Sequence, residues 1–209
     1  ERPAANHPRL LPASGATRFA ARLLDEYFDE MGLYFAHHNR WVLSASTNDA
    51  GQRLAREFRT LVPRPLRRRF AERFAARQVR RLPYLFSVAG AEPERYDLPA
   101  YRRPPGRAGF PSTNDLLDTC FRRMLDRLDA VYRAQPFLLG ERFSVADASA
   151  YGQLAMNLSD PTAAATIELR AAATAARVRS FASRGADSST ASHELRPCLV
   201  PLLEEIGET

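Results

Sequence analysis

Two pairs of residues in this sequence carry side chains that could do chemistry. Ser144 and Asp147 place a hydroxyl three residues before a carboxylate, a pairing that can make a nucleophile and its base. Tyr27 and Tyr34 lie seven residues apart, so on a helix their rings share a face and their hydroxyls can orient an electrophile. Each pair also has a purely structural explanation.

The structural explanation is the stronger one for Ser144 and Asp147. No Gly-x-Ser-x-Gly elbow surrounds Ser144, whereas Ser-x-x-Asp is the pattern of a capping box, in which serine accepts from the Asp147 N–H and the carboxylate from the Ser144 N–H. The helix predicted at 145–158 carries Asp147 as its one charge, which indicates a buried helix. We therefore expect a structural N-capping box, whose loss without Asp147 costs about 1 to 3 kcal/mol.

The sequence leaves two roles possible for Tyr27 and Tyr34, packing in the core and contact with a ligand. Aromatic residues at helical spacing belong more often to a core than to a binding site. Metal binding has less support, because the adjacent His37 and His38 point about 100° apart on a helix and no partner has ligand spacing. We expect no metal site.

Helical periodicity runs through most of the chain and indicates an all-α bundle of about six to eight helices. Two neighbouring ridges, one with Phe19 and Tyr27 and one with Leu24 and Phe28, indicate a long first helix. The best strand candidate, 83–88, is short and isolated, and a Pro/Gly-rich loop is predicted at 92–111. Helices are predicted at 14–41, 51–61, 66–82, 115–131, 145–158, 167–181 and 195–206.

The positive charge of the chain is concentrated in one segment. All 30 basic residues are arginines, a bias typical of a GC-rich, bacterial-like coding sequence, and the formal net charge is +6. Eleven of these arginines lie between Arg53 and Arg81, against only Glu57 and Glu72. Aromatic residues do not alternate with the arginines, so the pattern favours a solvated face, or one paired with acidic groups of another domain, over nucleic-acid contacts. One face of the predicted helix carries Arg69, Arg73, Arg77 and Arg80.

Cysteine usage and hydropathy indicate a cytoplasmic protein. Cys120 and Cys198 stand far apart without metal-ligand spacing, which is typical of reduced, buried thiols. No export signal opens the chain, and no apolar run reaches the roughly 18 residues that span a bilayer. We expect no membrane association.

The segment 135–155 reads QPFLLGERFSVADASAYGQLA and resembles the C-terminal, all-helical domain of glutathione transferases. In that family a Ser/Thr-x-x-Asp box opens a central buried helix after a Leu-Leu-Gly turn. The resemblance covers 115–183 well and 10–41 in part. Because 48–110 has no counterpart, we expect one helical domain over 1–209 with a basic helical insertion and the Pro/Gly-rich loop at 48–110.

The resemblance implies that the thioredoxin-like N-terminal domain, which holds glutathione as substrate and stabilises its thiolate, is absent from these residues. No catalytic residue can be carried over, and the chain alone is expected to be inactive. The helical domain of this family supplies the wall of the hydrophobic co-substrate pocket, which points to Tyr27 and Tyr34 as substrate-binding residues, and part of a homodimer interface. The alternative is a non-catalytic interaction module that binds an acidic protein or RNA through the Arg-rich segment 53–81.

Overall fold

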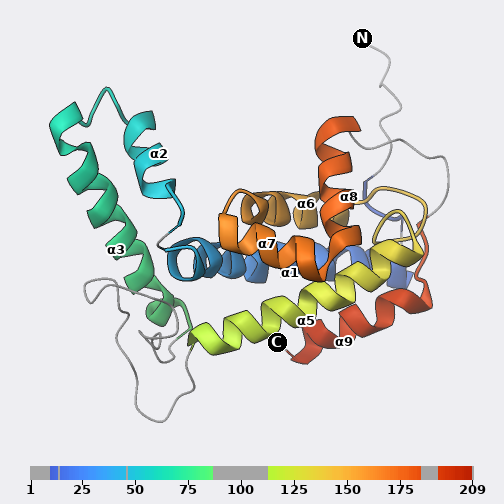
Figure 1. Cartoon of the computed structure of the whole chain (residues 1–209). Coiled ribbons are helices and arrows are strands. Elements are labelled where there is room, and N and C mark those ends of the chain that lie inside the picture. The colour runs from blue at the N-terminus through green and yellow to red at the C-terminus, as the bar shows by residue number, and fades with distance from the viewer. Residues whose placement is uncertain (1–9, 14, 46, 87–112, 185–192, 209) are drawn as a thin grey trace. The chain divides into compact units, whose positions relative to one another are not determined.

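The computed structural model describes residues 10–13, 15–45, 47–86, 113–184 and 193–208. Eight α-helices lie in these ranges and no β-strand does, which confirms the all-α prediction. The predicted loop at 92–111 lies outside the described residues. The helices, shown in Figure 1, are α1 (Gly15–His38), α2 (Ala50–Glu57), α3 (Arg67–Phe86), α5 (Thr113–Ala134), α6 (Val145–Leu158), α7 (Pro161–Arg170), α8 (Ala172–Arg184) and α9 (Val200–Glu208).

The long first helix is present and ends in a wider turn. α1 continues into a π-helical turn, Asn39–Leu43, which the Ser44 N–H closes by donating to the Asn39 carbonyl oxygen at 2.8 Å. Of the two predicted ridges, the one with Leu24 and Phe28 is buried at both of these residues, whereas Phe19 at the start of the other is 69% exposed. The prediction that both ridges are apolar contact faces was therefore wrong for Phe19.

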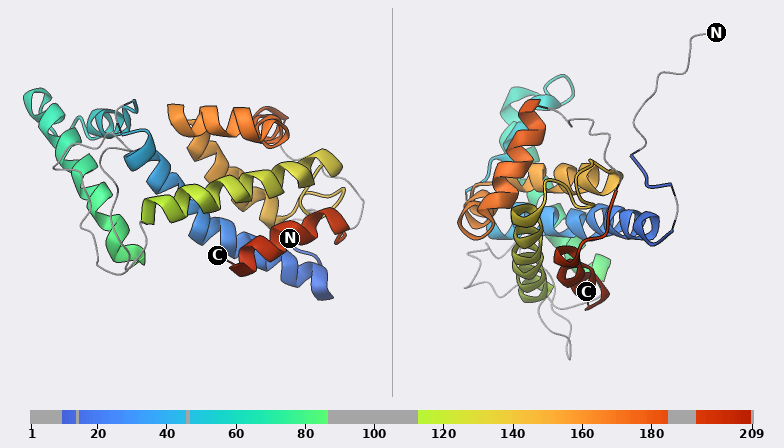
Figure 2. Two further views of the ribbon diagram at one scale, coloured as in Figure 1. Left: turned by 60° about the horizontal axis from the view of Figure 1, so that its bottom comes forward. Right: turned by 90° about the vertical axis from the view of Figure 1, so that its right-hand side faces the viewer.

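The chain divides into two compact units. The first comprises the described parts of Glu1–Leu33, Arg122–Ala155 and Ile167–Thr209. Its core is built mainly from the apolar face of α5 and from the turn and helix that follow, including Leu128, Val131 and Leu154. α9 lies beside α5 (Figure 2), where Arg123 Nε donates to the buried Glu205 carboxylate at 2.9 Å.

The helix predicted at 167–181 is two helices. Ala171 separates α7 from α8, and Asp129 Oδ1 of α5 accepts a hydrogen bond from the Thr174 N–H at 3.0 Å. In one continuous helix that N–H would donate to the carbonyl of Arg170. The buried Asp129 therefore begins a second helix here, and its other oxygen forms an ion pair with Arg133, at 2.7 Å.

The second unit comprises the described parts of Tyr34–Phe121 and Met156–Thr166. In it α2 and α3 lie side by side as a helical hairpin, joined through a short 3₁₀ helix, Arg64–Leu66 (Figure 1). The two helices approach closely at Gly51, where a Cβ would lie 2.9 Å from the Ala71 carbonyl oxygen. The strand candidate at 83–88 was wrong for 83–86, which belong to α3.

A polar network ties the end of α1 to the start of α7 in this unit. Arg40 Nε donates to Asp160 Oδ2 at 2.9 Å, and Arg40 Nη2 donates to the Ser159 hydroxyl at 3.1 Å. The Asp160 side chain is fully buried, and Pro161 begins α7 directly after it. Beside this pair, Asn39 Nδ2 donates to Asn157 Oδ1 at 2.7 Å.

Replacing Arg40 should destabilise the fold strongly, because it leaves the Asp160 carboxylate buried without its cation. We predict that Arg40→Ala lowers the free energy of unfolding by about 3 kcal/mol. The matched control is Arg53→Ala: Arg53 pairs with Asp49 at 3.1 Å, but the two side chains are 42% and 55% exposed. This control should cost less than about 0.5 kcal/mol. Urea denaturation followed by circular dichroism measures both, and equal losses would contradict the account.

Candidate functional site

The carboxylate of Asp147 lies at the centre of a buried hydrogen-bond network. Its Oδ2 accepts from the Ser144 N–H at 2.9 Å and from the Ser144 hydroxyl at 2.7 Å, while its Oδ1 accepts from the Leu138 N–H at 2.8 Å. All three residues are fully buried. The structure thus brings Ser144 and Asp147 together, with the serine hydroxyl donating to the carboxylate, and adds a bond to Leu138 that the sequence did not predict.

The turn before α6 has the conformation that this network requires. Gly140 has φ of 90°, where residues with a side chain are strained, and its carbonyl accepts from the Phe137 N–H at 3.2 Å. The Glu194 N–H, far along the chain, donates to the Leu139 carbonyl at 3.0 Å. The predicted burial of α6 is confirmed in part, since five of its residues are buried, eight are half-buried and Gly152 is exposed.

Burial controls the titration of this site. It raises the pKa of Asp147 from 3.8 to about 6, although the hydrogen bonds from Leu138 and Ser144 act in the opposite direction. Burial, and next the negative charge of Asp147, raise the pKa of Tyr132 well above its usual value. With both oxygens of Asp147 occupied by this network, the carboxylate holds the turn and the helix start together and is not a free base.

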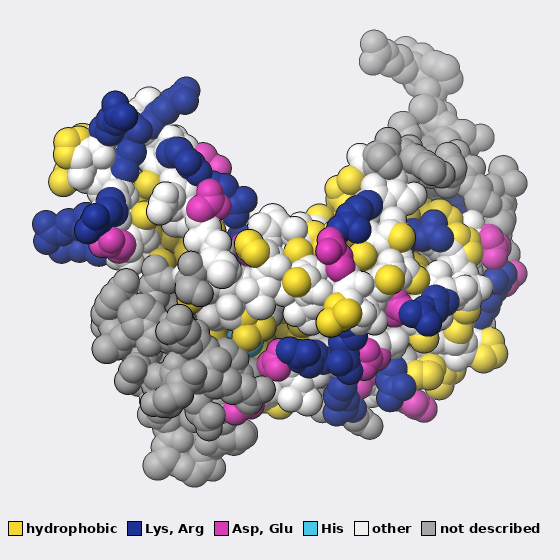
Figure 3. Space-filling view, viewed as in Figure 1, with side chains coloured by type: hydrophobic (Ala, Val, Ile, Leu, Met, Phe, Trp, Pro, Cys, Tyr) yellow, Lys and Arg dark blue, Asp and Glu magenta, His cyan; other side chains and the backbone are white. Residues whose placement is uncertain are grey.

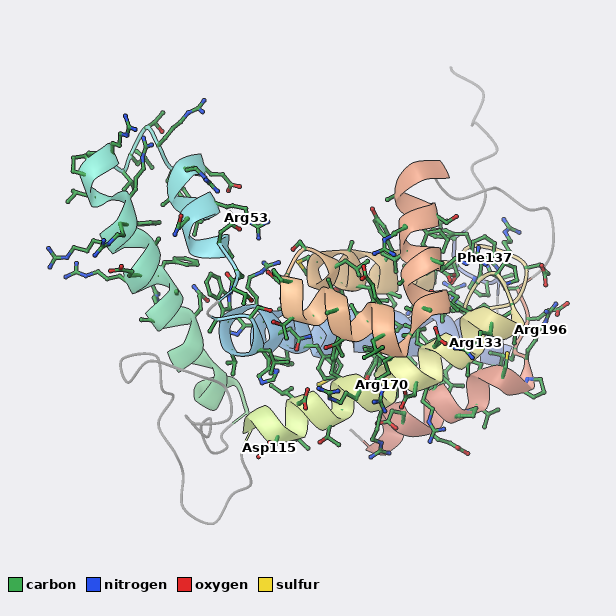
Figure 4. The ribbon with its side chains drawn as sticks, in the orientation of Figure 1. Arg53, Asp115, Arg133, Phe137, Arg170 and Arg196 are labelled. Carbon is green, nitrogen blue, oxygen red and sulfur yellow. The ribbon has the colours of Figure 1, made fainter. Side chains whose placement is uncertain are left out.

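An aromatic cluster packs the same turn against α8. The Phe137 ring stacks on Phe181 with centroids 6.0 Å apart, and Phe143 meets Phe181 edge-on at 5.4 Å. The Arg177 guanidinium lies 5.8 Å from the Phe137 centroid. Figure 4 shows Phe137 on the segment that follows α5. The Phe-Leu-Leu-Gly-x-x-Phe pattern therefore combines packing through its phenylalanines with hydrogen bonding through its backbone.

The two tyrosines of α1 differ in their surroundings. Tyr27 is buried, and its ring meets Phe28 edge-on with centroids 5.4 Å apart, which is the packing of a core residue. Tyr34 is half-buried, so part of its side chain remains accessible to a ligand. The structure therefore divides the pair into one core residue, Tyr27, and one partly accessible residue, Tyr34.

The other residues considered for chemistry show no reactive arrangement. Among the described residues, no cluster of His, Cys, Asp or Glu could hold a metal ion. His37 Nε2 lies 3.3 Å from Gln78 Oε1 on α3, and neither Cys120, which is buried, nor Cys198, which is half-buried, forms a disulfide. No helix in the described ranges is both long enough and apolar enough to cross a membrane.

Sequence reasoning missed a groove of about 520 Å³ along the outer face of the α2–α3 hairpin. It is lined by aliphatic side chains of the connecting turn, by Phe70 and Phe74, and by Arg69, Arg73 and Arg77. The one-turn spacing of these arginines was noted from the sequence. What the sequence did not indicate is that apolar residues of the turn fold back beside them.

The fold and the Asp147 network define a helical domain of a recognised kind. Residues 99–177 match the family model described as the glutathione S-transferase, C-terminal domain. This stretch, which includes the turn, α6 and α7, is therefore similar to the C-terminal domain of glutathione S-transferases. No curated protein and no solved structure matches the chain.

The raised pKa of Asp147 predicts a pH-dependent stability. Between pH 3.8 and about 6 the folded chain holds a proton on Asp147 that the unfolded chain has released. The stabilisation of the folded chain by this proton is complete below the unfolded-state pKa of Asp147 and is lost as the pH rises through its folded-state pKa. The free energy of unfolding should therefore fall with rising pH, by up to about 3 kcal/mol from this group.

Asp147→Asn cannot titrate and should reduce this fall, as measured by urea unfolding at about pH 4 and about pH 7. The matched control is Glu141→Gln, because Glu141 is an exposed carboxylate of the same turn. In Glu141→Gln the free energy of unfolding should still decrease with rising pH as it does in the unchanged chain. An unchanged pH dependence in Asp147→Asn would show that Asp147 is not the group responsible.

Proposed function

We propose that this chain is the co-substrate half of a glutathione transferase-like protein. In this role α1 and its neighbours form one wall of the pocket for a hydrophobic electrophile, and the domain contributes contacts to a second subunit. The observation that carries the proposal is the family match over residues 99–177, joined to the buried helix that the Ser144 and Asp147 pair begins.

Glutathione would be held by a thioredoxin-like domain outside these residues. A transferase of this kind needs a group that stabilises the glutathione thiolate for attack on the electrophile. Ser144 and Asp147 are not candidates for this group, because both are buried in their own network. The transfer reaction would therefore take place where the two domains meet, with this chain orienting the apolar partner.

Tyr34 is the residue that we propose to contact the electrophile, with Tyr27 supporting the helix from inside. A half-buried tyrosine offers an apolar ring together with a hydroxyl, which suits an aromatic ligand that carries polar substituents. The buried Tyr27 cannot reach such a ligand without a rearrangement of the core.

The test is binding of a chlorodinitrobenzene to the 209-residue chain, measured by equilibrium dialysis. We predict that Tyr34→Ala weakens binding about fivefold, through loss of an aromatic contact. Leu33→Ala is the matched control, because Leu33 is its neighbour on α1 and is 52% exposed. The control should bind as the unchanged chain does, and equal losses in both variants would contradict the assignment of Tyr34.

The same chain should not accelerate conjugation of glutathione to that electrophile. Turnover above the uncatalysed rate by these residues alone, measured by the absorbance of the conjugate, would overturn the division of labour proposed here.

A further inference from the structure

We propose that the α2–α3 hairpin binds an acidic amphipathic helix of a partner protein in the groove along α3. This inference develops the interaction alternative that the arginine content raised, and it does not depend on the transferase function proposed above. It rests on three features of the hairpin: the shape of the groove, its exposed aliphatic residues and its unneutralised charge.

The groove is open and shallow, which fits a helix better than a small molecule. Every residue that lines it is exposed or half-buried, so a small ligand would keep much of its surface in water. A convex helix laid along α3 would instead cover the groove over its length. Residues 67–77 of α3 alone span about 15 Å, or roughly three helical turns.

Aliphatic side chains at the turn supply the apolar contact. Leu61 is 76% exposed and Leu66 is 53% exposed, and both line the groove. Phe70 and Phe74 form its floor, stacked with centroids 6.2 Å apart, and Phe74 also packs against Trp41. Because these rings are engaged in packing, they are not free platforms for stacked bases, which favours a peptide over RNA.

The charge of the groove selects an acidic partner. Arg69, Arg73 and Arg77 follow each other at one-turn spacing along its edge and are exposed. Among the residues that the structure describes, no carboxylate pairs with these three. Elsewhere on the hairpin some arginines do have partners, as Arg68 pairs with Glu72 and Arg56 with Asp49. Figure 3 shows arginine side chains gathered over this hairpin with hydrophobic ones between them.

A helix with glutamates at one-turn spacing matches this edge. Carboxylates at i, i+4 and i+8 on a helix have the same rise as guanidinium groups at the same spacing on α3. Leucines on the neighbouring face of that helix would then meet Leu61 and Leu66. This is the arrangement in which an amphipathic helix lies in an apolar groove with charges along its rim.

The probe is a synthetic amphipathic helix of about 18 residues with one leucine face and glutamates at one-turn spacing along its flank. Fluorescence anisotropy measures its binding to the full 209-residue chain.

We expect the triple charge reversal of Arg69, Arg73 and Arg77 to glutamate to weaken binding about tenfold. Replacing the glutamates of the peptide by glutamine should weaken it by a similar factor. The double variant Leu61→Ser and Leu66→Ser should weaken binding about fivefold through loss of apolar contact.

The matched control carries the same change of net charge outside the groove. It reverses three exposed arginines of the hairpin that do not line it, Arg59, Arg64 and Arg68. This control should weaken binding less than about threefold, and circular dichroism shows whether every variant remains folded. If both triple variants lose the same affinity for the peptide, the arginines act only through general electrostatic attraction, and the proposal is overturned. An absence of effect from the leucine pair would overturn it too.

Two other possible ligands of the groove are tested in the same anisotropy assay. A short single-stranded RNA and vesicles containing phosphatidylserine are titrated as competitors of the labelled peptide. We expect neither to displace it at physiological salt. Displacement by either one at comparable concentration, lost in the groove triple variant, would assign the groove to that ligand and overturn the peptide proposal.

Discussion

A buried carboxylate that accepts three hydrogen bonds holds the first unit of this protein together. Asp147 takes the Ser144 N–H, the Ser144 hydroxyl and the Leu138 N–H, so the turn after α5 and the start of α6 share one acceptor group. None of these donors is accessible to water, and without Asp147 each would be buried with no acceptor. The desolvation of the carboxylate, which raises its pKa to about 6, is the cost of that arrangement.

Features encoded by neighbouring residues were predictable from the sequence. A serine three residues before an aspartate indicated where α6 begins, and the near absence of charge in 145–158 indicated its burial. The helix predicted at 115–131 corresponds to α5, because apolar residues such as Phe121 and Leu128 recur there every three to four residues, which is a local signal. The same reasoning gave the all-α class and the family of the 135–155 segment.

Features that depend on partners distant in the sequence were not predictable. Asp129 splits the predicted helix at Ala171 by taking the Thr174 N–H, and no local pattern at 167–181 shows this. Arg40 and Asp160 meet across 120 residues, and the one local signal was the Ser-Asp-Pro sequence that begins α7. The exposure of Phe19 likewise depends on which elements lie opposite α1.

The two surfaces considered for function have different origins. Tyr34 belongs to α1, for which we propose a role in the co-substrate pocket, whereas the groove belongs to the hairpin at 50–86, for which the sequence showed no family counterpart. The groove needs the turn at 58–66 to bring Leu61 and Leu66 beside the arginines of α3. A charge count alone could indicate the arginines but not the apolar residues between them.

The measurement that tests this account most directly is hydrogen exchange of the Leu138 and Ser144 amides, followed residue by residue by NMR. If the Asp147 carboxylate holds both amides, they should exchange as slowly as the centre of α6, for example Leu154, through global unfolding alone. Exchange of either amide at the rate of an exposed turn would contradict the central role given to Asp147.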